Sequence, residues 1–335
     1  MAETYGRSGG ECALRPAVRL LGAPYAAAMR LRRTAYNCGL MPRYAAGVPV
    51  ICVGNITSGG TGKTPMVAWV VGRLKGAGRR PAILTRGYKA VEGRSDEAEL
   101  LKQLAGVPVV INADRAAGAK QAAAGGADVL VMDDGFQHMR LRRNLDIVLI
   151  DATNPFGGGC PPAGLRREPL SALRDAGAIV ITRSSDVPKE QLEKLKTRLS
   201  RLAPAATVHA AVHKPVAIVD EAGGRLPAGR IEGKSVLAFC GVGNPESFFA
   251  ALERLGAKLT CRRALGDHVR YTSKVIDSLN RAADDTQVEL LVTTQKDFVK
   301  LQGVSFGRPL WQLAVEIELV EGPRALEEAI LEAVR

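Results

Sequence analysis

Apolar residues along the first half of this chain follow two alternating periods. Short apolar runs predict strands at 48–54, 81–85, 107–111, 127–132, 145–150 and 177–182. Apolar positions at helical spacing predict helices at 65–77, 96–105 and 113–124, and a more polar helix is expected at 189–202. Strands that alternate with helices are typical of βαβ units. The pattern therefore predicts an α/β fold with a mostly parallel sheet and helices on both faces.

A second alternating block begins after a segment rich in Pro, Ala and Gly. It predicts helices at 246–255 and 273–283, and strands near 235–239, 257–263 and 288–293. A chain of 335 residues also exceeds the usual size of a single hydrophobic core. We therefore expect N-terminal helices, a large domain, an inter-domain connection and a smaller α/β domain, at 1–45, 46–205, 206–234 and 235–335.

A glycine-rich turn separates the first predicted strand from the helix that follows it. The turn consists of Thr57, Ser58, Gly59, Gly60, Thr61, Gly62, Lys63 and Thr64. Backbone N–H groups of such a loop surround phosphate oxygens, while Lys63 can reach the β/γ-phosphates and the Thr64 hydroxyl can ligate Mg²⁺. Thr57 stands where the strict motif has Gly. An ordinary glycine-rich turn is the alternative, but strand, loop and helix together predict a P-loop NTPase-type fold that binds a nucleotide.

Two aspartates end the strand predicted at 127–132. In P-loop proteins an aspartate at such a strand end holds the Mg²⁺ of the nucleotide. Ligands of open α/β sheets also lie outside these strand ends. Asp133 and Asp134 are therefore candidate metal ligands. The alternative is a pair of aspartates that begins a turn.

Three further polar residues give weaker signals when taken alone. Asp96 and Glu97 open a predicted helix, where acidic residues are common because they offset the helix dipole. His268 lies in a predicted loop, and an isolated loop histidine is usually a surface residue. His209 and His213 have no partner pattern and are expected to be structural or exposed.

Composition narrows the choice of partner. The net charge of +12 favours a polyanion: nucleic acid, an anionic membrane surface or a phosphorylated substrate. Aromatic residues make up only 4% of the chain, which speaks against base stacking on nucleic acid. The six cysteines form no C-x-x-C pair, so reduced thiols are expected rather than a disulfide framework or a zinc site. Neither a transmembrane run nor a cleavable signal pattern is expected.

Basic and apolar residues are interleaved near the N-terminus. The basic residues are Arg15, Arg19, Arg30, Arg32, Arg33 and Arg43. The apolar ones share a helical face and are Leu14, Val18, Leu21, Tyr25, Ala28 and Met29. Pro24 is expected to divide the segment into two short helices. The pattern fits a membrane-surface element as well as it fits a helix packed on its own domain with a solvated basic face.

Taken in order, the motifs of the chain resemble those of the tetraacyldisaccharide 4′-kinase family, the lipid A 4′-kinases. The resemblance runs from about residue 14 to 330. The matching motifs cover 33–40, 54–65, 85–88, 96–97, 112–115, 133–138, 162–170, 239–249, 267–268 and 296–297. The strings Asp-Asp-Gly-Phe-Gln-His at 133–138 and Gly-Asn-Pro-Glu-Ser-Phe at 243–248 are more specific than the P-loop.

This resemblance implies a phosphotransferase with an alcohol acceptor. Such a kinase transfers the γ-phosphate of ATP to the 4′-hydroxyl of a tetraacylated glucosamine disaccharide 1-phosphate, a lipid A precursor in lipopolysaccharide biosynthesis. It acts as a peripheral protein on the cytoplasmic face of the bacterial inner membrane, with no nucleic acid partner. The N-terminal helices would then contact the anionic membrane, 46–205 would be the P-loop kinase domain, and 235–335 would close over the active site.

The resemblance also implies roles for single residues. Asp96 matches the catalytic aspartate, His268 matches its partner across the cleft, and Lys63 acts on the transferring phosphate. With Thr64, the residues that hold or orient Mg²⁺ would be Glu97, Asp133 and Asp134.

The chain departs from the family pattern at a few positions near these motifs. Ser95 and Ala98 flank the Asp-Glu pair, and the segment between 88 and 96 is short. Val269 and Arg270 follow the histidine where His-Pro is usual, and Gln295 precedes Lys-Asp in place of Glu. These changes affect positioning and acyl-chain preference rather than reaction class.

Two other classes of function are alternatives. One is a P-loop switch ATPase of the partition or metal-insertion kind, which leaves the second-half motifs unexplained. The other is a nucleic-acid-binding ATPase.

Overall fold

The computed structural model describes residues 10–87, 95–267 and 269–335. Within these residues the strands form one sheet, in the order β10-β9-β11-β12-β7-β6-β5-β1-β4-β2-β3, with β8 paired to β7. The first six strands are β1 (Val50–Asn55), β2 (Pro81–Thr85), β3 (Val109–Ile111), β4 (Val129–Asp133), β5 (Leu145–Asp151) and β6 (Ala178–Thr182). The others are β7 (Thr207–Val219), β8 (Arg225–Pro227), β9 (Ser235–Cys240), β10 (Lys258–Ala264), β11 (Leu290–Thr294) and β12 (Leu310–Glu321).

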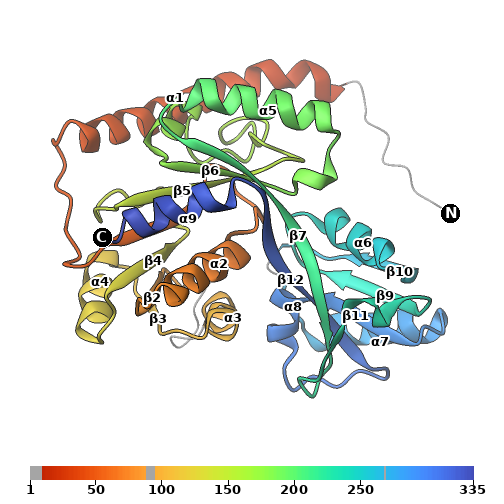
Figure 1. Cartoon of the computed structure of the whole chain (residues 1–335). Coiled ribbons are helices and arrows are strands. Elements are labelled where there is room, and N and C mark those ends of the chain that lie inside the picture. The colour runs from red at the N-terminus through yellow and green to blue at the C-terminus, as the bar shows by residue number, and fades with distance from the viewer. Residues whose placement is uncertain (1–9, 88–94, 268) are drawn as a thin grey trace.

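Helices cover the sheet in both halves of the molecule (Figure 1). They are α1 (Gly10–Asn37), α2 (Lys63–Gly76), α3 (Asp96–Ala105), α4 (Arg115–Ala124), α5 (Lys189–Leu202), α6 (Pro245–Arg254), α7 (Ser273–Asp285), α8 (Gln295–Phe298) and α9 (Pro323–Glu332). From β7 to β3 every pair of neighbouring strands is parallel. The α/β fold expected from the sequence is confirmed.

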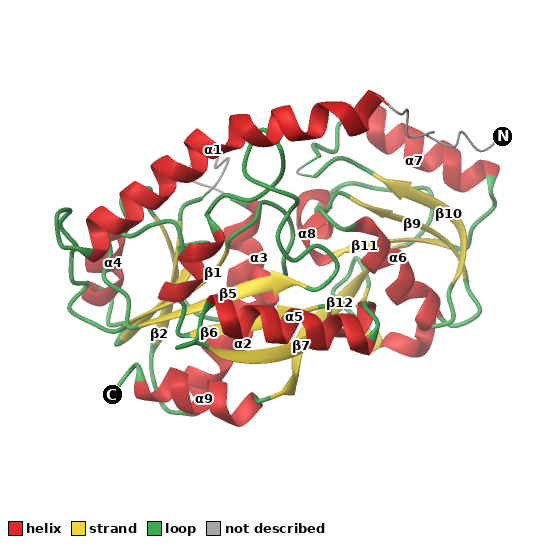
Figure 2. Ribbon diagram, turned by 90° about the horizontal axis from the view of Figure 1, so that it is seen from above, coloured by secondary structure: helices red, strands yellow, loops and turns green. Residues whose placement is uncertain are grey.

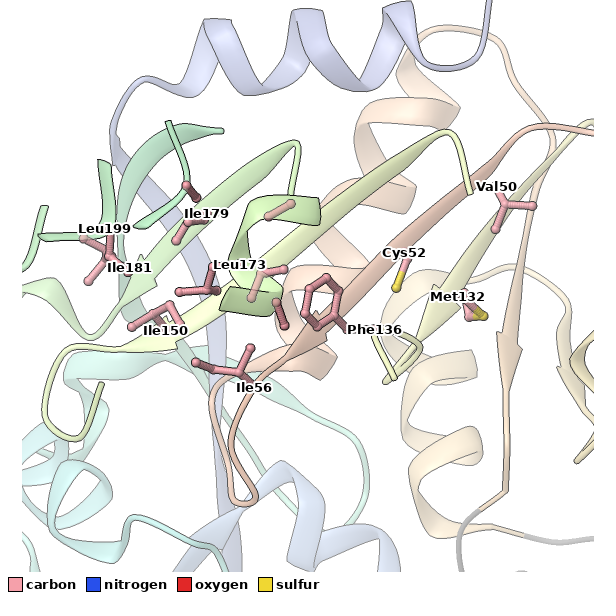
Figure 3. Packing of buried hydrophobic residues seen from close by; sticks show 14 of the residues in the cluster. Val50, Cys52, Ile56, Met132, Phe136, Ile150, Leu173, Ile179, Ile181 and Leu199 are labelled. Atoms are coloured by element: carbon pink, nitrogen blue, oxygen red, sulfur yellow. The ribbon is translucent and has the colours of Figure 1, made fainter. Parts of the chain in front are cut away.

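Successive residues of β1 point into two different cores. Val50 and Cys52 belong to a buried cluster that includes Phe136 (Figure 3). Ile51 and Val53 belong to a second cluster on the opposite face, with the buried side of α2. Because a strand in a parallel sheet is covered on both faces, the residues that point to either face are apolar, here from Val50 to Val53, and the period of two is hidden. For this reason the strand reads as one continuous apolar run.

Two long strands join the halves of the molecule. β7 pairs with β6 in parallel up to Ala210 and with β12 in antiparallel along most of its length. The segment 206–234, expected as a connection, thus contributes β7 to the sheet itself. After β12 the chain returns to the first half, where Leu326 and Ile330 of α9 join the cluster that contains α2. The domain boundaries stay a prediction, and α9 lies within 235–335 although it packs on the larger half.

The N-terminal region differs from its prediction. In place of two short helices divided at Pro24, α1 is one helix of 28 residues (Figure 2). A proline inside a helix removes one hydrogen bond. Contacts with the rest of the molecule hold the next turns in place, because the Tyr25 hydroxyl donates to the Arg167 carbonyl at 3.0 Å and Arg32 donates to the Gln137 carbonyl at 2.9 Å. In the described part of the chain, no helix combines the length and apolar character needed to cross a bilayer.

The basic cluster of α1 is also divided between surface and interior. Arg33 is only 5% exposed, and its guanidinium lies 4.6 Å from the centre of the Phe136 ring. Its partners are Glu168 at 3.3 Å and Asp175 at 2.6 Å. Arg30, by contrast, is exposed. The charge of Arg33 is thus neutralised inside the protein and does not belong to a solvated basic face.

Candidate active site

The glycine-rich turn forms a loop between β1 and α2. Gly62 has a φ of 86°, in the left-handed region that glycine adopts freely, and serves as the N-cap of α2. The helix therefore begins at Lys63, two residues before the predicted start at 65. Thr57 is not among the residues with positive φ and forms an isolated bridge with Arg166. Glycine is not required at this position, which explains why the departure from the strict motif is tolerated.

Neighbouring strand ends hold the loop in place. The Asn55 side chain donates to the Thr61 hydroxyl at 2.9 Å. From the end of β6, the Thr182 hydroxyl donates to the Thr61 carbonyl at 3.0 Å. Arg183 donates to the Gly60 carbonyl at 2.8 Å and also pairs with Asp151. The loop is thus fixed by side chains that its own sequence does not contain.

The two aspartates follow β4, which lies next to β1 in the sheet. Asp133 is 6% exposed, and its Oδ1 atom is buried without a hydrogen-bond partner. Burial, together with the neighbouring Asp134 carboxylate, raises the pKa of Asp133 to about 7. Asp134 lies 3.5 Å from Lys63. Burial acts to raise the pKa of Asp134, but Lys63 and Arg167 outweigh burial and hold it below its usual value.

A cleft of about 1060 Å³ separates the two halves of the molecule. Its wall includes the phosphate loop from Ser58 to Thr64, together with Asp133 and Asp134. The second half contributes Asn244 and Lys296. Lys296 reaches across to Glu97 at 3.9 Å and also pairs with Asp267 at 3.2 Å. The cleft therefore brings a phosphate loop, carboxylates and cations together.

A magnesium ion needs oxygen ligands and usually shares them with substrate phosphates. Among the described residues, no group of three or more His, Cys, Asp or Glu side chains could by itself hold a metal ion. The partnerless Oδ1 of Asp133 and the Thr64 hydroxyl nevertheless belong to the same cleft as Asp134. This donor set fits an ion that takes its remaining ligands from phosphate and water.

The sequence-predicted acids at the start of α3 occupy different environments. Glu97 is part of the cleft wall. Asp96 is exposed and lies outside that wall. His268 falls outside the described residues, whereas Asp267, which precedes it in the sequence, lines the cleft. The catalytic roles of Asp96 and His268 stay predictions.

Sequence reasoning gave no role to several basic residues of the cleft, among them Arg167, Arg183 and His213. Arg167 donates to both carboxylate oxygens of Asp134, at 2.9 and 3.1 Å, and lies in the matched motif 162–170. Arg183 directly follows β6, so its position after a strand end was a usable signal. His213, expected to be structural or exposed, is partly buried and lines the cleft. No local pattern marks His213, because its neighbours come from distant segments.

Comparison with known proteins decides the family. The family described as tetraacyldisaccharide-1-P 4′-kinase matches residues 14–335. This chain belongs to that family. A tetraacyldisaccharide 4′-kinase of Anaeromyxobacter dehalogenans is 40% identical over 340 residues, covering 93% of this chain and 88% of the relative. One from Geobacter metallireducens is 36% identical, covering 93% of this chain and 96% of the relative.

A solved structure agrees with the family assignment. LpxK from Aquifex aeolicus, crystallised with ATP, has a TM-score of 0.76 and 27% identity to this chain. The match covers 96% of this chain and 100% of that one. The family, the fold and the class of activity expected from the sequence, a phosphotransferase of lipid A biosynthesis, are confirmed. The switch ATPase is not favoured.

Proposed function

We propose that this protein transfers the γ-phosphate of ATP to the 4′-hydroxyl of a tetraacylated glucosamine disaccharide 1-phosphate. One observation carries the proposal: the phosphate loop and the two strand-end aspartates face a single cleft that the second half also lines. ATP is the donor, in keeping with the ATP in the Aquifex aeolicus crystal. The acceptor follows from family membership. No nucleic acid takes part.

The phosphate loop binds and orients the donor. The N-terminus of α2 carries free backbone N–H groups and the positive end of the helix dipole, both of which stabilise phosphate oxygens. Lys63 adds a full charge where negative charge is transferred. Arg167 holds Asp134 beside Lys63, so that the carboxylate and the ammonium keep fixed positions.

Mg²⁺ would be held by the Thr64 hydroxyl and by at least one of Asp133 and Asp134. Glu97, which lines the same cleft, would orient its water ligands. The ion neutralises charge on the β- and γ-phosphates when it is bound.

Asp96 would accept the proton of the acceptor hydroxyl. The hydroxyl oxygen forms a bond to the γ-phosphorus, the bond from that phosphorus to the bridging oxygen of ADP breaks, and the proton passes to the carboxylate. His268 would orient this carboxylate across the cleft. Because Asp96 lies outside the cleft wall, the reaction requires the two halves to approach further. The contacts of Lys296 with Glu97 and Asp267 already join the segments that have to meet.

The acceptor is a lipid, and the surface near the end of α1 suits its membrane. Leu31 is 73% exposed and Leu40 is 80% exposed. Met41 and Tyr44 are also exposed, and exposed Arg30 lies next to Leu31. Apolar side chains beside basic ones favour an anionic lipid surface. We place this surface against the cytoplasmic face of the inner membrane, where ATP is available.

Product analysis tests the proposal. The protein is incubated with ATP, Mg²⁺ and the disaccharide 1-phosphate lipid in detergent, and the lipid is examined by mass spectrometry. A bis-phosphorylated lipid is expected from the wild type, and a strongly reduced yield from Asp96→Asn with ATP binding retained. A switch ATPase would instead dimerise on ATP and leave the lipid unchanged.

A further inference from the structure

Two histidines of β7 pack against glycines that begin helices. Gly62 is the N-cap of α2 with a φ of 86°, and Gly322 is the N-cap of α9 with a φ of 66°. A Cβ atom added to Gly62 would lie 2.5 Å from Nε2 of His213. A Cβ atom added to Gly322 would lie 2.6 Å from Nδ1 of His209. Each ring thus fills the space directly beside the Cα atom of a left-handed glycine.

The two histidines differ in what they border. His209 is 2% exposed, and its Nε2 atom is 2.7 Å from the Thr207 hydroxyl. His213, by contrast, belongs to the cleft wall. The Gly62 turn that His213 contacts leads directly into Lys63 and Thr64 of the phosphate loop.

His213 also lies at a junction in the sheet. β7 pairs with β6 as far as Ala210, whereas His213 pairs with Ile317 of β12. From this point β7 and β12 continue into the second half (Figure 1). The ring therefore joins the phosphate loop to the two strands that carry the second half.

The ring is uncharged at neutral pH. Burial, together with the charge of Arg183, lowers the pKa of His213 to about 4, against the smaller opposing effects of Asp151 and Asp186. A neutral ring adds no cation to the loop, so its contribution is steric. Because glycine has no Cβ atom, it can leave the left-handed region for more conformations than any other residue. A ring packed on its Cα atom restricts these alternatives.

We propose that His213 is a positioning residue that holds the left-handed turn at Gly62 in the shape that binds nucleotide phosphates. Through this contact, the backbone N–H groups of Lys63 and Thr64 are aligned before the nucleotide arrives. Preorganisation of this kind strengthens binding by lowering its ordering cost. The inference rests on the proposed function only in taking ATP as the nucleotide.

The test compares His213→Ala with His209→Ala, a matched control on the same strand. Dissociation constants for ATP and ADP are measured by calorimetry, with Tm measured in parallel. We expect His213→Ala to weaken nucleotide binding about tenfold, corresponding to about 1.4 kcal/mol, and His209→Ala to change it less than about twofold. Both variants should lose similar thermal stability. Equal nucleotide affinity in the two variants would overturn the proposal.

A conservative variant separates ring packing from other effects. The Gln side chain in His213→Gln reaches the same space, so nucleotide affinity should return to within about threefold of wild type. Affinity as poor as that of the alanine variant would contradict a packing role. In steady state, KM for ATP should rise in His213→Ala more than kcat falls. If His213→Ala does not fold, His213→Asn is used in its place. This variant should bind nucleotide more weakly than the wild type, but its loss of affinity should be less than about tenfold.

The binding measurements need no lipid acceptor. An affinity difference between the two alanine variants, found in a protein that phosphorylates no lipid, would leave the role of His213 standing and refute the proposed function. Lipid phosphorylation together with unchanged nucleotide affinity in His213→Ala would support the proposed function and refute the role of His213.

Discussion

The ammonium of Lys63 lies 3.5 Å from a carboxylate oxygen of Asp134. Arg167 donates to the same carboxylate from the other side, at 2.9 and 3.1 Å. Three segments that are far apart in the sequence therefore meet at one charged point of the cleft. Because two cations share one carboxylate, positive charge is left over to attract a phosphate group.

Removal of the phosphate-loop groups should abolish most of the activity. Lys63→Ala deletes the charge that stabilises the transferring phosphoryl group, and Thr64→Ala deletes a Mg²⁺ ligand. Turnover with ATP and the lipid acceptor should fall roughly a hundredfold or more in each variant. Lys120→Ala, which removes an exposed lysine of α4, serves as the control and should keep full turnover. Near-normal turnover in Lys63→Ala would refute the assignment of the loop.

Asp133 should make the metal-free protein less stable as the pH rises. Its pKa is raised to about 7 in the folded protein, against a usual value of 3.8. The stability associated with the protonated form is fully present below the usual pKa and is lost as the pH rises through about 7. Each pKa unit corresponds to about 1.4 kcal/mol, so the effect should amount to a few kcal/mol.

Urea unfolding in EDTA at pH 5 and pH 8 measures this effect. The loss of stability between the two pH values should be smaller in Asp133→Asn than in the wild type. Identical losses in the two proteins would show that Asp133 titrates normally.

Arg33 should matter for stability rather than for membrane binding. Arg33→Ala leaves Glu168, only 2% exposed, with its charge buried and uncompensated. Breaking a buried pair in this way typically costs about 3–5 kcal/mol. Urea unfolding should detect the loss, and Arg30→Ala on the exposed side of α1 should change stability by less than about 0.5 kcal/mol. Equal effects of the two substitutions would contradict the buried position of Arg33.

The exposed apolar residues near the end of α1 should mediate membrane binding. The double variant Leu31→Glu, Leu40→Glu should bind vesicles containing anionic lipid at least about tenfold more weakly, because it removes apolar contacts and adds negative charge. Val320→Glu is the matched control, since Val320 is 51% exposed but belongs to β12. Co-sedimentation measures binding. A double variant that sediments like the control would show that this surface faces water.

Local sequence patterns were enough to predict much of the fold and part of the candidate site. The apolar runs located β1 and β4, and the glycine-rich turn located the phosphate loop. Asp133 was identified as a candidate metal ligand because it ends a buried strand, and this feature can be recognised from the sequence alone. These signals are contiguous and need no knowledge of the tertiary structure.

The parts that were missed depend on distant contacts. Arg33 read as a surface charge because its partners, Glu168 and Asp175, lie more than 130 residues away. His213 gave no pattern because the glycine it contacts belongs to another segment. Pro24 predicted a break, but contacts of α1 with the first half outweigh one lost hydrogen bond.

The coupling of ATP consumption to lipid phosphorylation tests the central claim most directly. ADP and phosphorylated lipid are measured in the same reaction, with and without the tetraacylated disaccharide 1-phosphate. We predict one ADP for each new lipid phosphate, and little ADP when the lipid is omitted. ADP formation that does not depend on the lipid, with no phosphate transferred to it, would contradict the account.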